Sequence, residues 1–258
     1  MRFNLPESFQ ESFEHYHLPG SIKNLGVMSD VHLPYQSNEA VEEALNYFIN
    51  KKVDAILLNG DILDCYMFSK FEPDPRKRQF KHELESFREF ITTIKENVTS
   101  RIFYKLGNHE ERYEKAMILK APQFLDLPYF DFENVLGCGK MGVEVIKDQR
   151  IVYAGMLPIF HGHELGLKSV SVNPARSLFL KVHANAMCSH LHRTSQHTEP
   201  SLTEDIKCWS TGHLGESYPK YARINKWNHG VARIEKDEAG NFEVINFALK
   251  KNKLFATV

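Results

Sequence analysis

The first half of the chain alternates between short apolar runs and amphipathic helical patterns, and this alternation limits the folds available to it. Residues 22–28 and 53–58 are apolar runs, and between them apolar residues recur at the i, i+3, i+4 spacing of a helix. A second cycle has a helical pattern over residues 80–94 and a third strand pattern over residues 101–106. Strands that alternate with helices pair in parallel through right-handed crossovers. The sequence therefore predicts an α/β fold.

The second half is predicted to be rich in strands. Short strand patterns cover residues 143–146, 151–160, 186–188, 206–210, 231–234 and 242–247. Asn173 and Pro174 form an N-cap followed by proline at the first helical position, which predicts a helix over residues 175–182. The sequence has no internal repeat, low-complexity tract or linker. We expect an N-terminal extension over residues 1–20 and a single domain over residues 21–258.

The composition indicates a globular protein without an overall attraction to polyanions. Of the 258 residues, 42% are hydrophobic, and 32 basic against 33 acidic residues give a net charge of −1. No apolar stretch approaches the roughly 18 residues of a membrane helix, and the N-terminal segment is too polar and acidic for a signal peptide. The four cysteines lack C-x-x-C spacing, which predicts free thiols. We expect a cytoplasmic protein that does not contact a membrane.

Polar side chains follow five of the predicted strands. The five clusters are Asp30-Val31-His32, Gly60-Asp61-Ile62-Leu63-Asp64, Gly107-Asn108-His109-Glu110, His161-Gly162-His163 and Ser189-His190-Leu191-His192. Because the carboxyl ends of strands in an open α/β sheet line one crevice, the clusters should converge there. Buried together without partners, these groups would be costly. Carboxylate, amide and imidazole groups are, however, ligands for divalent metal ions, so the pattern predicts a metal site.

The five clusters resemble, in order, the motifs of the calcineurin-like metallophosphoesterase family, which are D-x-H, G-D-x-x-D, G-N-H-E, H-G and G-H-x-H. The matching residues run from Asp30 to His192. The resemblance implies two mixed β-sheets packed face to face and flanked by helices, with a dinuclear metal centre at the strand ends. It also assigns ligands to one ion (Asp30, His32 and His192), to the other (Asn108, His161 and His190) and to both (Asp61).

The chemistry of these ligands agrees with the activity that the resemblance implies. One bridging carboxylate can hold two divalent ions about 3.5 to 4 Å apart, so that both contact one phosphate and activate one water molecule. Ligands without thiolate suit Mn, Fe, Zn or Ni, and we favour manganese. In the family, the equivalent of His109 protonates the leaving group or stabilises charge on the phosphate. Asp64 would orient His109, and its alternative role is a helix cap.

Either histidine of the H-G-H sequence could reach a metal ion. We favour His161, because it is the first polar residue after its strand, and Gly162 would let the chain turn and carry His163 outward. His163 would then contact the substrate or support the ligands. The alternative, with His163 as the ligand and His161 in the core, stays open. Glu110, the last residue of the third cluster, and Arg112, two residues further on, are further candidates for substrate contacts or for supporting the ligands.

Two departures from the family motifs bear on the substrate and on the ligands. Ser/Thr protein phosphatases continue G-D-x-x-D with Arg-Gly, whose arginine grips the phosphate, whereas this chain has Cys65 and Tyr66. A role as a protein phosphatase is therefore disfavoured. Ser189 stands where the last motif has glycine, and we expect the turn to adjust without the loss of His190 as a ligand.

The sequence favours a phosphodiesterase that acts on nucleic acid or a nucleotide, similar to the nuclease-like and phage-type members of the family. Aromatic and basic residues within 62–81 and 209–227 could stack bases and pair with phosphates, or they form ordinary surface loops. A phosphomonoesterase is the first alternative. A non-catalytic scaffold, as in the retromer subunit that resembles this family, is a remote one, because it predicts lost ligands and every ligand position is filled here. The sequence does not indicate an oligomeric state.

Overall fold

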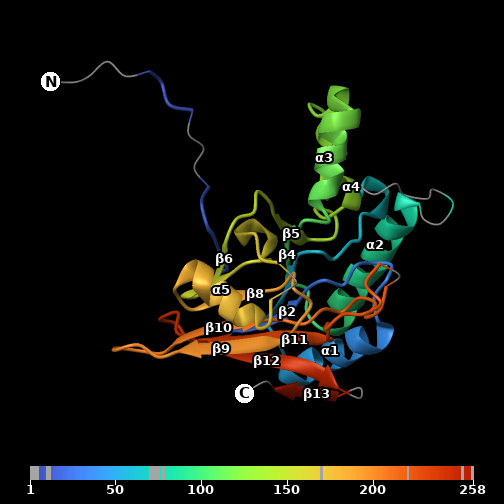
Figure 1. The fold of residues 1–258 in the computed structure, drawn as a ribbon. Coiled ribbons are helices and arrows are strands. Elements are labelled where there is room, and N and C mark those ends of the chain that lie inside the picture. Colours follow the sequence, from blue (N-terminus) through green and yellow to red (C-terminus); the bar gives the residue numbers. More distant parts are fainter. Residues whose placement is uncertain are drawn as a thin grey trace.

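Two mixed β-sheets pack face to face, and helices cover their outer faces (Figure 1). This arrangement is seen in a computed structural model that describes residues 6–9, 13–69, 76, 79–168, 171–219, 221–250 and 253–256. The predicted α/β fold class is confirmed.

The larger sheet has seven strands in the order β13-β12-β11-β2-β3-β4-β5. Its parallel part consists of β2 (Asn24–Met28), β3 (Ala55–Asn59), β4 (Ile102–Lys105) and β5 (Val143–Ile146). Its antiparallel part consists of β11 (Gly230–Lys236), β12 (Phe242–Lys250) and β13 (Lys253–Ala256). Because β2, β3 and β4 are parallel neighbours, the loops that follow them leave the sheet at the same edge.

The smaller sheet has six strands in the order β1-β6-β7-β8-β10-β9. These are β1 (Tyr16–His17), β6 (Val152–Ala154), β7 (Leu157–Ile159), β8 (Ala186–Cys188), β9 (Ser195–Glu199) and β10 (Ile206–Ser210). The single strand predicted over residues 151–160 is wrong, since the chain reverses there and β6 pairs antiparallel with β7. β1 lies within the segment predicted as an extension and pairs in parallel with β6.

Five α-helices lie in the described part of the chain. They are α1 (Asn38–Lys51), α2 (Phe80–Asn97), α3 (Glu111–Lys120), α4 (Phe132–Leu136) and α5 (Pro174–Val182). α5 begins as predicted, with the side chain of Asn173 accepting a hydrogen bond from the backbone nitrogen of Arg176 at 3.1 Å. The sequence did not predict α3, which projects from the body (Figure 1), because only Tyr113 of this helix is buried and an apolar stripe is missing.

The side chains of β3 show how the layers are held together. Ala55 and Leu57 face the smaller sheet and belong to the core between the sheets, whereas Ile56 and Leu58 face the opposite way, into the core beneath α1 and α2. A separate core packs α5 against the smaller sheet. All four side chains are fully buried, and burying the larger ones contributes about 1.5 to 3 kcal/mol each. The strand ends are therefore rigid supports for the loops that follow them.

Two further sequence expectations concern the cysteines and the membrane. The four cysteines are buried and free, as predicted. In the described part of the chain, every helix is too short or too polar to cross a bilayer.

Candidate metal centre

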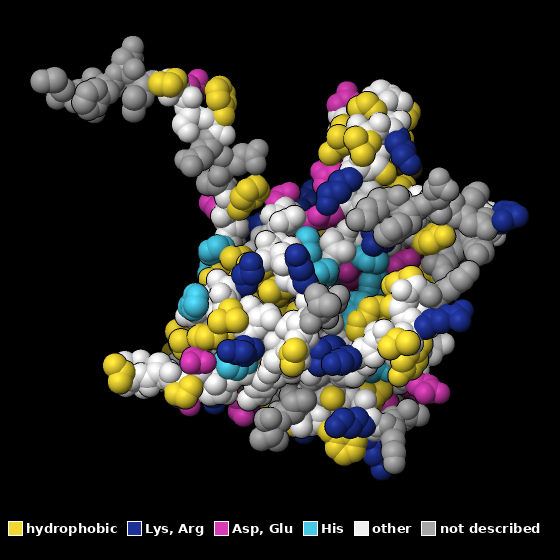
Figure 2. All heavy atoms as spheres, in the orientation of Figure 1, with side chains coloured by type: hydrophobic (Ala, Val, Ile, Leu, Met, Phe, Trp, Pro, Cys, Tyr) yellow, Lys and Arg dark blue, Asp and Glu magenta, His cyan; other side chains and the backbone are white. Residues whose placement is uncertain are grey.

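The five polar clusters converge at the carboxyl ends of β2, β3, β4, β7 and β8. Three groups of His and Asp side chains have ligand atoms within 4.8 Å of one another: Asp30 with His32 and His192, Asp61 with His161 and His190, and His32 with Asp64 and His109. The first group has the same residues as one ligand set that the sequence resemblance implied, and the second group contains His161, His190 and the bridging Asp61 of the other set but not its Asn108. Figure 2 shows histidine side chains gathered on this face below α3.

Five of the candidate ligands lie on backbone in the left-handed region. The φ angle is 51° at Asp30, 53° at His32, 51° at Asp61, 65° at His190 and 56° at His192. Non-glycine residues rarely adopt positive φ, although Asp and His do so more readily than most, and the cost is of order 1–3 kcal/mol for each residue. Such a concentration of unusual backbone at the ends of neighbouring strands is typical of a functional site.

Two glycines of the predicted motifs make room for the ligands. A Cβ atom on Gly60, where φ is 85°, would lie 2.3 Å from Nδ1 of His161. A Cβ atom on Gly107 would lie 2.4 Å from Oδ1 of Asp61. Both distances are well below van der Waals contact, so any side chain at either position would displace a candidate ligand.

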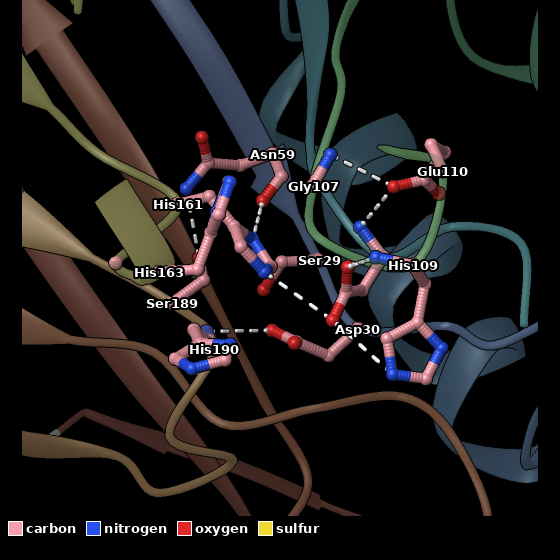
Figure 3. Close-up of polar contacts among 12 residues, drawn as sticks. Ser29, Asp30, Asn59, Gly107, His109, Glu110, His161, His163, Ser189 and His190 are labelled. Atoms are coloured by element: carbon pink, nitrogen blue, oxygen red, sulfur yellow. Dashed lines mark hydrogen bonds and ion pairs between the residues drawn. The ribbon is translucent and has the colours of Figure 1, made fainter. Parts of the chain in front are cut away.

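The hydrogen bonds of His161 leave one ring nitrogen available to a metal ion. Its Nδ1 lies 2.7 Å from the backbone oxygen of Asn59 and donates to it, so Nε2 carries the free lone pair. Nε2 points into the site, 3.3 Å from Oδ2 of Asp61 (Figure 3). The ring is fully buried. A histidine held in this way is suited to be a metal ligand.

His163 lies beyond Gly162, whose φ is 128°, and has both ring nitrogens next to carboxylates. Nε2 is 2.9 Å from Oε1 of Glu111, and Nδ1 is 3.3 Å from Oε2 of Glu164. Nε2 of His163 is therefore engaged by Glu111, and His163 belongs to none of the three ligand groups, whereas His161 does. This geometry favours His161 over His163 as the ligand.

The carboxylates make the site strongly attractive to cations. Burial alone would raise the pKa of Asp30, Asp61 and Asp64, but the neighbouring histidines hold all three below their ordinary values. Burial lowers the pKa of His161, yet Asp61 outweighs burial and raises that pKa to about 10. Burial and the charge on His161 lower the pKa of His190 to about 4. The carboxylates thus require positive charge close to Nε2 of His161, which a proton or a metal ion can supply.

Several buried ligand atoms have no hydrogen-bond partner among the described residues. They include Oδ1 of Asp30, Oδ1 of Asn108, Nε2 of His161 and Nδ1 of His190. A buried polar atom without a partner is costly, and several such atoms from different loops in one place are what a metal site requires. The residues present therefore fit divalent metal ions.

Glu110 supports two of the loops and turns away from the ligand groups. Its carboxylate, which is 1% exposed, accepts hydrogen bonds from the backbone nitrogens of Asp61 at 3.0 Å, Leu63 at 2.9 Å and Gly107 at 2.8 Å (Figure 3). It also accepts one from the hydroxyl of Tyr104 at 2.8 Å. Of the two roles that the sequence left open for Glu110, the geometry favours support of the ligands.

A second supporting carboxylate, Glu164, was missed by the sequence reasoning. It accepts hydrogen bonds from the backbone nitrogens of His161 at 2.9 Å and Gly162 at 2.6 Å, and lies 3.2 Å from Nζ of Lys105. Lys105 is fully buried at the end of β4, within the strand predicted over residues 101–106. Burial lowers the pKa of Lys105, and the nearby charge of Glu164 opposes this shift. The sequence offered one signal, an acidic residue three positions after His161.

Ser189 fits the turn in which the family motif has glycine. The positive φ falls on His190, so the serine side chain meets no backbone conflict. Its buried hydroxyl accepts from Nδ2 of Asn59 at 2.8 Å and lies 3.0 Å from Oγ1 of Thr211. The backbone nitrogen of His190 donates to Oδ2 of Asp30 at 3.1 Å (Figure 3). The turn thus keeps His190 in the group with Asp61 and His161.

His109 lies at the edge of the ligand groups, with its ring held by Asp64 and Arg112. Its Nδ1 is 2.9 Å from the backbone oxygen of Asp64 and 3.2 Å from the Oδ1 atom of that residue. Nε2 is 2.7 Å from Nη2 of Arg112, and Nη1 of Arg112 donates to the backbone oxygen of Asp64 at 2.9 Å. Asp64 also lies 3.5 Å from Nδ1 of His32, and so links the two histidines.

An aromatic wall adjoins the ligand His192. The ring of His213 stacks on it, with centroids 4.9 Å apart, and the ring of Trp227 meets it edge-on at 4.4 Å. Tyr221 extends the wall, 6.4 Å from Trp227. Burial lowers the pKa of His213 well below its ordinary value. One of the two aromatic segments noted in the sequence, residues 209–227, therefore lies beside the site.

The other aromatic and basic segment, residues 62–81, does not provide a comparable surface in its described part. Phe68 packs edge-on against Phe80 and Tyr113, at 4.8 and 5.2 Å, and so contributes to the core. Residues 70–75 and 77–78, which carry most of the basic run, lie outside the described residues.

A two-sheet α/β fold with His, Asp and Asn side chains at its strand ends is typical of metal-dependent hydrolases that act on phosphate esters. A model of the calcineurin-like phosphoesterase family matches residues 23–230, and the chain belongs to this family. The resemblance inferred from the motifs is thereby confirmed. A comparison with curated proteins finds no match.

Solved structures with a similar fold include vacuolar protein sorting proteins. Vacuolar Protein Sorting 29 from Cryptosporidium parvum is 13% identical, with a TM-score of 0.48, over 92% of this chain and 96% of that one. Wild-type Vps29 complexed with zinc from Entamoeba histolytica is 11% identical, with a TM-score of 0.46, over 91% of this chain and 97% of that one. At this level of identity, neither comparison indicates what this chain does.

Proposed function

We propose that this protein is a phosphodiesterase that hydrolyses nucleic acid or a nucleotide with the help of two divalent metal ions. The observation that carries the proposal is the convergence of six of the seven proposed ligand side chains, with buried, unpartnered atoms among them and on the seventh, Asn108. One ion would be held by Asp30, His32 and His192, the other by Asn108, His161 and His190, and both by Asp61. We favour manganese, with Fe, Zn and Ni as alternatives. The bound ions would polarise the phosphate and lower the pKa of a water molecule that attacks it.

In this proposal His109 acts on the leaving group. It neighbours the ligand Asn108 in sequence, and its backbone nitrogen donates to Oδ1 of Asp61 at 2.9 Å, which fixes the loop beside the bridging carboxylate. Asp64 orients the ring through Nδ1. A general acid at this point contributes roughly 100- to 10,000-fold to the rate. We expect Asp64→Asn to lower kcat by less than the loss of His109 does.

The preference for diesters is supported by the residues that surround the site. Cys65, at the position of the phosphatase arginine, is fully buried and supplies no positive charge to a phosphate dianion. The aromatic wall formed by His213, Trp227 and Tyr221 offers a surface on which a base could stack. The alternative is a phosphomonoesterase acting on a protein or a small molecule.

One panel of substrates tests the proposal. Purified protein with Mn²⁺ is assayed against bis- and mono-nitrophenyl phosphate, cyclic nucleotides, single- and double-stranded DNA and RNA, and a phosphoserine peptide. We expect faster hydrolysis of diesters, with activity lost in excess chelator and in His109→Ala. Faster turnover of the phosphopeptide than of any diester would favour the phosphomonoesterase. A lack of activity on every substrate would favour the non-catalytic scaffold.

Two broader expectations also remain proposals. We propose a single metallophosphoesterase domain over residues 21–258, preceded by the N-terminal segment, and a cytoplasmic location. Both rest on the sequence alone.

A further inference from the structure

Arg112 places a guanidinium group beside the candidate reaction centre without a carboxylate to neutralise it. Its side chain is partly buried, and its Nη1 and Nη2 atoms contact the backbone oxygen of Asp64 and Nε2 of His109. No ion pair joins this guanidinium to any carboxylate among the described residues. The positive charge of Arg112 is therefore held by two neutral acceptors.

These two contacts define where the proton of His109 lies. A guanidinium group stays charged and can only donate, so Nε2 of His109 accepts from Arg112 and carries no proton. The proton lies on Nδ1 and is donated to the backbone oxygen of Asp64. In this arrangement Nε2 cannot protonate a leaving group, because Arg112 occupies it.

From this geometry we infer that Arg112 binds the phosphate group of the substrate, and that its move onto the phosphate frees Nε2 of His109. The inference rests on the proposed function and deepens it. A phosphate oxygen is a stronger acceptor for guanidinium than a carbonyl or an imidazole, and two parallel hydrogen bonds suit the planar fork of arginine. Arg112 would supply from α3 the phosphate contact that the buried Cys65 cannot supply.

The reaction step that follows is balanced. As the oxygen of water forms its bond to phosphorus, the bond from phosphorus to the leaving oxygen breaks, and the leaving oxygen keeps that electron pair. The proton that Nε2 of His109 has taken up from solvent passes to the leaving oxygen. The attacking water releases a proton to solvent, so the number of protons taken from solvent equals the number returned to it. Arg112 contacts the non-bridging oxygens of the phosphate throughout and is neither acid nor base.

The test compares Arg112→Ala and Arg112→Lys with Arg88→Ala. Arg88 is a matched control, because its guanidinium also donates to two neutral acceptors, the backbone oxygens of Leu136 at 3.3 Å and Val135 at 3.2 Å, but it does so from α2. Binding of inorganic phosphate to the Mn²⁺-loaded protein is measured by calorimetry. Manganese content, and kcat and KM for bis-nitrophenyl phosphate, are measured in parallel. Activity of each alanine variant is then measured with low millimolar guanidinium chloride added.

We expect Arg112→Ala to bind phosphate about 10- to 100-fold more weakly than the wild type, with manganese content unchanged. Its kcat should fall, and guanidinium should restore part of the activity. Arg112→Lys should recover part of the phosphate binding, because lysine keeps the charge but not the fork. Arg88→Ala should match the wild type and gain nothing from guanidinium.

Three results would overturn the inference. Phosphate affinity in Arg112→Ala within twofold of the wild type would exclude the phosphate contact. An unchanged kcat would exclude a contact between Arg112 and the phosphate during the reaction. Loss of manganese would show that Arg112 acts by holding the ligands in place. If the wild type hydrolyses no diester, the proposed function fails, while phosphate binding still tests Arg112 separately.

Discussion

Glu110→Gln should destabilise the protein and disturb the metal centre, although Glu110 is not a ligand. Its two carboxylate oxygens each accept two hydrogen bonds: Oε2 from the backbone nitrogens of Asp61 and Gly107, and Oε1 from Leu63 and Tyr104. An amide nitrogen cannot accept, so glutamine must lose one of the two pairs.

The least costly orientation of the new amide turns its nitrogen toward Leu63 and Tyr104. The hydroxyl of Tyr104 can rotate and accept, but the buried backbone nitrogen of Leu63 is left without a partner. An unsatisfied buried group costs about 1 to 3 kcal/mol, and the hydrogen bonds that remain lose the contribution of the negative charge. We therefore expect a loss of about 2 to 4 kcal/mol in the free energy of unfolding. For a domain of this size, Tm should fall by about 5 to 15 °C.

Thermal unfolding is followed by circular dichroism in excess chelator, so that bound metal ions do not contribute to stability. Glu114→Gln is the matched control, because Glu114 is exposed in the first turn of α3, next to Glu110 at the start of that helix. This substitution should change the free energy of unfolding by less than about 0.5 kcal/mol. Affinity for Mn²⁺ is measured separately and should fall in Glu110→Gln, since the loop of Asp61 loses a support. A Tm within 2 °C of the wild type corresponds to a change of roughly 1 kcal/mol or less in the free energy of unfolding. That result would refute this account of the hydrogen bonds.

Asp61→Asn should weaken both metal sites together, measured by elemental analysis after gel filtration, and retention of both ions would contradict the bridging role. His161→Ala should lose one metal ion, whereas His163→Ala should keep both ions and change mainly KM or kcat. Metal loss only in His163→Ala would show that His163, and not His161, is the ligand. His109→Ala should lower kcat by about 100-fold or more at unchanged metal content, and a collapse of metal occupancy would make it a ligand. For Glu111, burial raises the pKa but its hydrogen bonds, first to His163, lower it to about 2. Because this pKa is below the ordinary 4.5, the stabilisation is present above pH 4.5 and lost as pH falls toward 2. The free energy of unfolding, measured with urea, should therefore fall less steeply between pH 4.5 and 2 in Glu111→Gln than in the wild type. An equally steep fall in both proteins would show that the contact of Glu111 with His163 does not contribute to stability.

The parts of the fold that the sequence predicted are those with a strong local pattern. β3 is buried throughout and β5 is buried at both ends, and the buried positions are mostly apolar, so both strands could be located within a few residues. β9, with the sequence Ser-Gln-His-Thr-Glu, is polar on both faces and could not be recognised. Its pairing with β10 depends on tertiary contacts that no local pattern records.

The candidate ligands were easier to predict than their supports. Asp30 and Asp61 follow apolar strands directly or after one small residue, so the rule that strand ends converge was sufficient to bring them together. Lys105 and Glu164 also support the site, but their ion pair joins residues 59 positions apart, which no local pattern records. Arg112 was a candidate because of its position in the sequence, while its contact with His109 could be seen only in the structure.

The supports explain how the fold maintains unfavourable backbone at the ligands before any ion binds. Asp61 and His190 hold positive φ, which each would avoid in a free loop. Glu110 anchors the backbone nitrogen of Asp61, and the carboxylate of Asp30 anchors that of His190. Because these hydrogen bonds are buried and involve charges, each contributes about 1.5 to 3 kcal/mol, which matches the backbone cost of the residue it holds. The loops are therefore ordered by contacts within the protein, and the free energy of metal binding does not have to supply that order. Replacing a support should consequently weaken metal binding even where every ligand side chain is retained.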